Sequence, residues 1–382
     1  MDVFGLNAEQ LDAAGAHWTA REIVQQPQVW SEIQGLVGGV RSFLAPLLAR
    51  PDMRIVLTGA GTSGFIGECL APALARSTSL RVEAVSTTDL VASPGSWLAA
   101  NTPTLLVSFS RSGNSPEAVA AIDVAEACVK QCYHLIVTCD AEGALFRSAT
   151  KMSNAKSLLL PDASNDRSFA MTSSFTGMLL AAALVLGALG EDDERSARLA
   201  HFAKQVLPER APLLQDLVSS KFERIVYLGS KELKGLSRES ALKMLELTDG
   251  KVVAIADSPL GFRHGPKTIL NRNTLVVVFV CNDEYTRQYD LDLIAELRRD
   301  GVAGRVVAIS AGAVPQRPDN VDLHGAAGDS DLELCLPYAM FAQSLALLRS
   351  LSLGVRPDNP NAAGTVSRVV KGVTIHPWRG TA

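Results

Sequence analysis

Two loops rich in serine, threonine and glycine could bind a phosphate group. Residues 59–64 (GAGTSG) and residues 110–117 (SRSGNSPE) each follow a short apolar run. Pro116 suits the first turn of a helix, with Ser115 as its N-cap. Hydroxyl groups, backbone N–H groups and a helix dipole together favour a dianion. We therefore predict one phosphomonoester site at the carboxyl edge of a sheet, although either loop alone could be no more than a tight turn or a capped helix start.

The first loop also matches the pattern G-x-G-x-x-G, which is typical of dinucleotide-binding folds. Glu83 lies near the next apolar run, where an acid that binds a ribose could stand. Two features argue against a nucleotide. Glu83 is followed by further strand-like residues, and Thr62 and Ser63 add hydroxyl groups to a loop that mainly needs close backbone approach.

Five further residues are candidates for acid–base chemistry. Glu239, Lys243 and Glu246 fall at positions i, i+4 and i+7, on one face of a helix. Such a pair of carboxylates beside an ammonium group could move a proton between adjacent carbons, or could form a solvated stripe of salt bridges. His264 stands in a glycine-flanked loop, where an imidazole could transfer a proton near neutral pH or have no role. Lys371, in a short apolar tail, is either a desolvated amine or an edge residue that reaches solvent, and its surroundings favour the second.

Short apolar strands alternate with helical stretches along the chain, which predicts an α/β fold with mostly parallel sheets covered by helices on both faces. The segment RIVYLG at 224–229 repeats RIVLTG at 54–59, which indicates a duplication. We predict a helical, peripheral lead-in over residues 1–40, a first domain over 41–205 and a second domain with a C-terminal tail over 206–382. Strands are expected at 54–58, 81–86, 104–109, 134–139, 224–229, 252–256, 274–280 and 304–309. Helices are expected at 62–75, 115–131, 172–189, 234–248, 286–300 and 336–352, with one long helical pattern around 193–220.

Composition excludes several classes of protein. The chain has 382 residues, of which 47 % are hydrophobic and 20 % charged, and this is typical of a globular protein. A net charge of −4 disfavours nucleic acid and acidic membranes as partners. Six scattered cysteines without a C-x-x-C pair indicate free buried thiols in a reducing compartment, the cytoplasm. The first residues resemble no signal peptide, and the apolar run 175–190 is too short to span a membrane, so we expect a buried core helix there.

In combination, four motifs resemble the sugar isomerase (SIS) family: residues 59–64, 110–117, 239–246 and 263–266 (RHGP). The resemblance covers nearly the whole chain as two tandem SIS domains. Residues 19–27 are similar to the lead-in of the isomerase half of glucosamine-6-phosphate synthase. Residues 108–117 and 229–239 are similar to the galactosamine-6-phosphate deaminase/isomerase branch, long named tagatose-6-phosphate ketose/aldose isomerase.

The resemblance implies a role for each candidate residue. Glu246 matches the carboxylate that moves the proton between C1 and C2, and Glu239 and Lys243 match its helical neighbours. His264 matches the ring-opening histidine, which the adjacent subunit donates in the synthase. Lys371 matches the lysine that binds the open-chain carbonyl, although the tail before it differs in length. The residues expected to bind the phosphate are Thr62, Ser63, Ser110, Arg111, Ser112 and Ser115, of which Arg111 stands where the synthase has glutamine.

The resemblance also implies a direction for the reaction. The synthase carries a glutaminase domain with a cysteine directly after Met1, whereas residue 2 here is Asp2 and we expect no such domain. The expected reaction therefore releases ammonia from galactosamine 6-phosphate and gives tagatose 6-phosphate, in a homo-oligomer with shared active sites. It needs no metal and no redox cofactor.

Three alternatives stay open. One is an aldose–ketose isomerase acting on tagatose 6-phosphate, and a second is a glucosamine-6-phosphate deaminase. The third is a non-catalytic sugar-phosphate sensor. The sensor is disfavoured because residues 1–50 carry three arginines and five acidic residues, a net charge of −2, which does not suit a DNA-binding domain.

Overall fold

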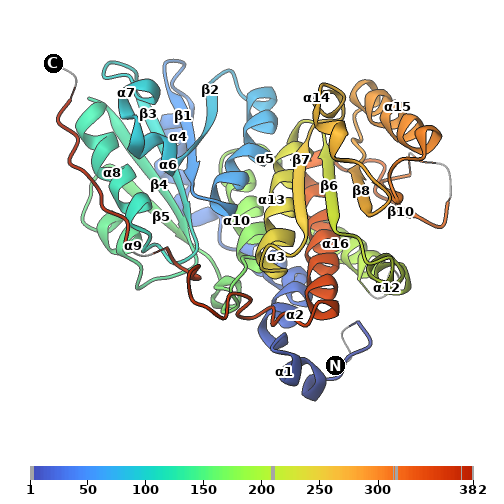
Figure 1. Ribbon diagram of the computed structural model, residues 1–382. Coiled ribbons are helices and arrows are strands. Elements are labelled where there is room, and N and C mark those ends of the chain that lie inside the picture. Colours follow the sequence, from blue (N-terminus) through green and yellow to red (C-terminus); the bar gives the residue numbers. More distant parts are fainter. Residues whose placement is uncertain (1–3, 208–210, 313, 315–316, 371, 381–382) are drawn as a thin grey trace. The chain divides into compact units, whose positions relative to one another are not determined.

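The computed structural model describes residues 4–207, 211–312, 314, 317–370 and 372–380 (Figure 1). The chain forms two compact units, each built on one five-stranded parallel sheet. The first-sheet unit comprises Gln28–Asp166, Ser173–Asp193 and Ala363–Ala382, and the second-sheet unit comprises Met1–Pro27, Arg167–Thr172 and Glu194–Ala362. The N-terminal segment thus belongs to the second-sheet unit, and the C-terminal segment belongs to the first-sheet unit. The predicted domain boundaries, at residues 41 and 206, describe a different division and stay a prediction.

The first sheet has the strand order β2-β1-β3-β4-β5. Its strands are β1 (Arg54–Gly59), β2 (Arg81–Ser86), β3 (Thr104–Ser110), β4 (Cys132–Thr138) and β5 (Ala155–Leu159). Side chains alternate between its two faces. Val56 packs in a cluster with the helices α6 (Thr87–Ala92), α8 (Pro116–Cys128) and α9 (Ala144–Ala149). Leu57 faces Gly67 of helix α5 (Thr62–Ser77) on the other side. Every residue of β1 and β3 is buried, as expected for central strands of a sheet with two covered faces.

The second sheet repeats this order as β7-β6-β8-β9-β10. Its strands are β6 (Arg224–Gly229), β7 (Val253–Asp257), β8 (Thr274–Phe279), β9 (Arg305–Ser310) and β10 (Asn320–Asp322). Each strand therefore has a counterpart in the first sheet, with β6 matching β1 and β8 matching β3. The α/β class and the duplication are confirmed. The expected strands are all present, but β5 and β10 were missed.

Helices precede, connect and follow the strands, and two expectations about them are wrong. The expected long helix over 193–220 is two helices, α11 and α12. The lead-in is not peripheral, because Ile23 and Trp30 are fully buried and the Trp30 indole donates a 3.0 Å hydrogen bond to Thr176 Oγ1. The helices before β6 are α1 (Ala8–Ala14), α2 (His17–Val24), α3 (Gln26–Gln34), α4 (Gly38–Leu48), α5 (Thr62–Ser77), α6 (Thr87–Ala92), α7 (Pro94–Trp97), α8 (Pro116–Cys128), α9 (Ala144–Ala149), α10 (Ser173–Val185), α11 (Arg195–Val206) and α12 (Ala211–Ser219). Those after β6 are α13 (Glu232–Leu247), α14 (Pro259–Phe262), α15 (Glu284–Asp300) and α16 (Asp331–Ser352), and η1 (Asp162–Ser164) and η2 (Pro266–Ile269) are 3₁₀ turns.

Two apolar helices, α10 and α16, are core elements. Nearly every residue of α10 is buried, as expected for the run at 175–190. Among the described residues one helix, α16, has the length and composition to cross a membrane, but 94 % of its most apolar window is buried inside the protein. All six cysteines are free, and five of them are buried.

Candidate active site

The first hydroxyl-rich loop joins β1 to α5. Gly59 is required there, because a Cβ atom would lie 2.4 Å from the carbonyl carbon of Ser63. Gly61, at φ 56° and ψ −128°, is the N-cap of α5. Thr62 and Ser63 follow as the first two helical residues and are almost fully buried. This close turn places two hydroxyl groups at a helix N-terminus, where the helix dipole favours an anion.

The second hydroxyl-rich loop joins β3 to α8. Ser115 is at the N-cap position and Pro116 begins the helix as predicted, but the Ser115 side chain makes no cap hydrogen bond. Ser110 Oγ accepts a 3.1 Å bond from the Gly113 N–H, and Ser112 Oγ accepts a 3.3 Å bond from the Asn114 N–H. Both serines act as acceptors in these bonds, so their O–H groups can donate to a ligand. Since β1 and β3 are parallel neighbours, the two loops follow the same edge of the sheet.

Arg111 differs from the serines around it. Its guanidinium is buried and donates a 3.0 Å hydrogen bond to the carbonyl of Arg368 in the C-terminal tail. Arg368 in turn donates to the carbonyl of Asp166. The structure thus shows Arg111 anchoring the tail beside the second loop, and its contact with a phosphate stays a prediction. Sequence reasoning missed this tail contact, because nothing local in the sequence marks it. Lys371, in the same tail, lies outside the described residues.

Glu83 has a structural explanation that needs no nucleotide. It pairs with the buried Arg54 of β1 and, at 2.9 Å, with Arg81 of its own strand. Partial burial alone would raise its pKa, but Arg81 and Arg54 hold the pKa of Glu83 below its usual range. The carboxylate is therefore committed to ion pairs.

The second-sheet unit contains the same strand-to-helix turn between β6 and α13. A Cβ atom on Gly229 would lie 2.4 Å from the carbonyl oxygen of Leu233. The N-cap of α13 is Lys231, at φ 53° and ψ −124°, which is nearly the conformation of Gly61. A lysine at positive φ is unfavourable, so the geometry that this turn shares with the first one overrides the preference of the residue. This turn fixes where α13 begins and hence where its charged face lies.

Glu239, Lys243 and Glu246 form a buried charged cluster on α13. The side chains of Lys243 and Glu239 are both 1 % exposed, and their charged atoms are 3.5 Å apart. Lys243 Nζ also donates to Glu246 Oε2, and the Glu246 side chain is 25 % exposed. A solvated stripe of salt bridges is therefore excluded. A buried ammonium group holds two carboxylates, and of these two only Glu246 is partly exposed to solvent.

His264 lies in the turn between α14 and η2 and is exposed. The backbone N–H of His264 donates a 2.9 Å hydrogen bond to the Gly261 carbonyl, and Gly265 has a φ of +117°. The flanking cations are fixed, since Arg263 and Lys267 both pair with Glu296 of α15. The imidazole is thus presented to solvent from an anchored turn. The structure brings the α13 cluster together as predicted and places His264 in a separate turn of the same unit.

Comparison with known proteins agrees with these features. The family model described as SIS domain matches residues 47–187. A Streptomyces coelicolor protein with the provisional name D-galactosamine-6-phosphate deaminase AgaS is 51 % identical, over 96 % of this chain and 97 % of that protein. An Escherichia coli protein named D-galactosamine-6-phosphate deaminase AgaS is 46 % identical, with the same two coverages. The crystal structure of tagatose-6-phosphate ketose/aldose isomerase from Escherichia coli has a TM-score of 0.88 and 44 % identity, and it covers 95 % of this chain and 97 % of that one. The chain therefore belongs to the SIS-domain family, in the branch of the proteins named D-galactosamine-6-phosphate deaminase AgaS.

Proposed function

We propose that the protein is an enzyme that converts galactosamine 6-phosphate and water into tagatose 6-phosphate and ammonia. The observation that carries this proposal is the charged cluster on α13, in which buried Lys243 holds Glu246 at the exposed end. Sequence identities of 51 % and 46 % to the two proteins named as deaminases above support the choice of substrate.

The reaction needs two kinds of site, and the chain offers both. The hydroxyl groups after β1 and β3 bind the 6-phosphate group, which stays unchanged through the reaction. His264 transfers the proton that opens the sugar ring to the free aldehyde. Glu246 then removes the proton from C2, which gives an enolamine, and returns a proton to C1.

The steps after proton transfer follow from the chemistry of the intermediate. Protonation at C1 converts the former aldehyde carbon into an alcohol and leaves an imine at C2. Water adds to the imine carbon and ammonia leaves, so that C2 becomes the ketone of tagatose 6-phosphate. C1 is reduced as C2 is oxidised, and the sequence is balanced without an external oxidant.

A second candidate is the plain aldose–ketose isomerase named for the Escherichia coli structure. Such an enzyme uses the same proton transfer on a substrate with a hydroxyl group at C2 and releases no ammonia. A glucosamine-6-phosphate deaminase differs only in the configuration of the substrate at C4. A sensor has no need of a buried lysine that holds a carboxylate, and we set it aside.

Direct measurement of ammonia separates these functions. Purified protein is given galactosamine 6-phosphate, glucosamine 6-phosphate and tagatose 6-phosphate in turn, with ammonia and sugar products followed separately. We expect ammonia in equal amount to tagatose 6-phosphate from the first substrate, with a much lower kcat/KM for the second. An aldose formed from tagatose 6-phosphate without any ammonia from either amino sugar would contradict the proposal and support the isomerase.

We also propose that the active enzyme is a cytoplasmic homo-oligomer in which one subunit supplies His264 to the site of another. Exposure of His264 in an anchored turn supports this arrangement, and the free thiols suit a reducing compartment. Glu246→Gln and His264→Ala proteins, each inactive, are mixed under conditions that exchange subunits. Hybrids should regain part of the wild-type activity, and no recovery after demonstrated exchange would contradict a shared site.

A further inference from the structure

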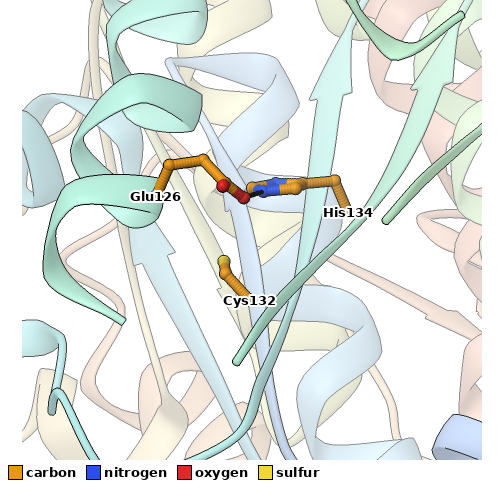
Figure 2. A group of neighbouring side chains, drawn as sticks. All are labelled: Glu126, Cys132 and His134. Atoms are coloured by element: carbon orange, nitrogen blue, oxygen red, sulfur yellow. Dashed lines mark hydrogen bonds and ion pairs between the residues drawn. The ribbon is translucent and has the colours of Figure 1, made fainter. Parts of the chain in front are cut away.

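Three side chains that the proposed reaction does not use lie together in the first-sheet unit, at the amino end of β4 (Figure 2). Cys132 and His134 are two residues apart in the strand, so their side chains lie on the same face of the sheet. Glu126 belongs to α8, which packs over that face. One donor atom from each of the three lies within 4.8 Å of the other two, and Glu126 Oε1 is 2.7 Å from His134 Nε2.

We propose that Glu126, Cys132 and His134 bind a zinc ion. A thiolate, an imidazole and a carboxylate are ligands that zinc takes at about 2.0–2.3 Å. Neighbouring ligand atoms in such a tetrahedral site are about 3.5 Å apart. The Glu126–His134 contact, at 2.7 Å, must therefore widen by about 1 Å. The Glu126 side chain is 42 % exposed and can make this movement, whereas the two strand residues are buried and fixed.

The surroundings of the three side chains support the proposal. Asn154 Nδ2 donates a 2.8 Å hydrogen bond to Glu126 Oε1 and a 2.9 Å bond to the Cys132 carbonyl, which orients the carboxylate toward the strand. Groups that orient metal ligands in this way are a usual part of a metal site. His134 Nε2 is the ring nitrogen that faces Glu126, and the ion would take the place of that hydrogen bond.

The choice of metal follows from the donor atoms. A thiolate disfavours calcium and magnesium, which take oxygen ligands. Binding converts the Cys132 thiol to a thiolate and releases its proton to solvent, while His134 binds as the neutral imidazole. A water molecule then occupies the fourth position.

The position of this site separates it from the sugar-phosphate chemistry. Cys132 is the first residue of β4, whereas the hydroxyl-rich loops follow the last residues of β1 and β3. In a parallel sheet, the first residues and the last residues of the strands lie at opposite ends of the sheet. We therefore assign the ion a structural or regulatory role, and the proposed activity does not depend on it.

Cobalt provides a spectroscopic test, because a thiolate bound to Co²⁺ gives a charge-transfer absorption. Full-length protein is freed of metal with a chelator, titrated with Co²⁺ and then with Zn²⁺. We expect one Co²⁺ per chain with thiolate absorption, and displacement by one Zn²⁺. Cys132→Ser should abolish the absorption. Cys69→Ser, which removes a buried cysteine of α5 in the same unit, should leave it unchanged.

A second variant, Glu126→Gln, tests the site if Cys132→Ser disturbs folding. The Glu126 side chain is 42 % exposed, so its replacement should not disturb the core. The variant should fold as judged by circular dichroism without metal. It should bind Co²⁺ at least about 10-fold more weakly, because loss of a direct ligand should cost no less than loss of an outer partner. Absence of thiolate absorption in the wild type, its persistence in Cys132→Ser, or unchanged affinity in Glu126→Gln would each overturn the proposal. Ammonia release by metal-free protein should equal that of the zinc-loaded protein.

Discussion

Replacement of Glu246 by glutamine tests which carboxylate transfers the proton. Glutamine keeps the size of the side chain and can accept a hydrogen bond from Lys243, but it cannot act as a base. Glu239 is the competing candidate on the same helix face. Its side chain is 1 % exposed, against 25 % for Glu246. Seven helical positions separate the two residues, about 10 Å along the axis, but both carboxylates contact Lys243 Nζ, so exposure and not distance distinguishes them.

The structure separates the expected effects of the two substitutions. Loss of a general base lowers the rate about 10²–10⁴-fold, which is about 3–5 kcal/mol in the activation barrier. Glu246 is partly exposed, so its loss should change the free energy of unfolding by less than about 1 kcal/mol. Glu239→Gln removes a buried charge beside Lys243 and should cost about 1–3 kcal/mol of stability. Glu246→Gln should therefore be a stable, inactive protein, and Glu239→Gln a less stable one.

Two assays check these expectations. Ammonia release from galactosamine 6-phosphate measures turnover, and incorporation of solvent deuterium at C1 or C2 of the sugar measures proton transfer directly. Glu246→Gln should show neither, while its affinity for the substrate stays near that of the wild type. Near wild-type exchange in Glu246→Gln together with lost exchange in Glu239→Gln would refute the reasoning, because it would assign the base to the buried carboxylate.

Three further predictions follow from individual contacts. Ser112→Ala removes a hydroxyl that we propose binds the unreacting phosphate, so steady-state kinetics should show KM rising more than kcat falls. A collapse of kcat at constant KM would show that the loop takes part in the chemistry. Lys243→Met leaves Glu239 buried without its cation and should lower the free energy of unfolding in denaturant by about 3–5 kcal/mol, and adding Glu239→Gln should recover part of this loss; an additive loss would contradict the pairing. Burial raises the pKa of Asp290 from 3.8 to about 6, so the folded state binds this proton more tightly than the unfolded state, and the stability contributed by Asp290 is full below about pH 4 and falls by about 3 kcal/mol as the pH rises through 6. Asp290→Asn should remove that part of the pH dependence in urea titrations, and parallel curves for the two proteins would contradict it.

Local sequence patterns were sufficient to predict most of the sheets. The hexapeptides at β1 and β6 each contain a run of apolar residues and end in glycine, and such runs mark strands covered on both faces. The strands β5 and β10 were missed for a physical reason. The first is a short strand at the edge of its sheet with partly exposed residues, and the second has three residues. Neither carries enough apolar periodicity to stand out.

The burial of particular residues could not be predicted, because it depends on contacts distant in sequence. The spacing of Glu239, Lys243 and Glu246 is the same in a solvated stripe and in a buried cluster. Lys243 is buried because α13 packs between the strands β6 and β7 and the helix α16, about 100 residues later. The same limit applies to Trp30 in the lead-in and to Arg368 in the tail, whose partners lie far along the chain.

The two sheets share the same turn after β1 and after β6, but the residues after their third strands, β3 and β8, differ. The first copy presents the hydroxyl groups of Ser110 and Ser112 after its third strand, which suits a phosphate. At the corresponding place, after β8 in the second copy, the N–H groups of Cys281 and Asn282 already donate to the carboxylates of Asp290 and Asp331.

Carboxylates of the chain itself thus occupy donors that could otherwise bind an anion. Lys231, at the N-cap of α13, forms a 3.0 Å ion pair with Asp331. Its ammonium group is therefore also paired with a carboxylate of the chain itself. A second phosphate at this edge would have to displace two buried carboxylates and would be repelled by them. The turn before α13 is thus filled by groups of the chain itself and acts as a fixed support for that helix, whose charged face carries the acid–base chemistry in the function that we propose.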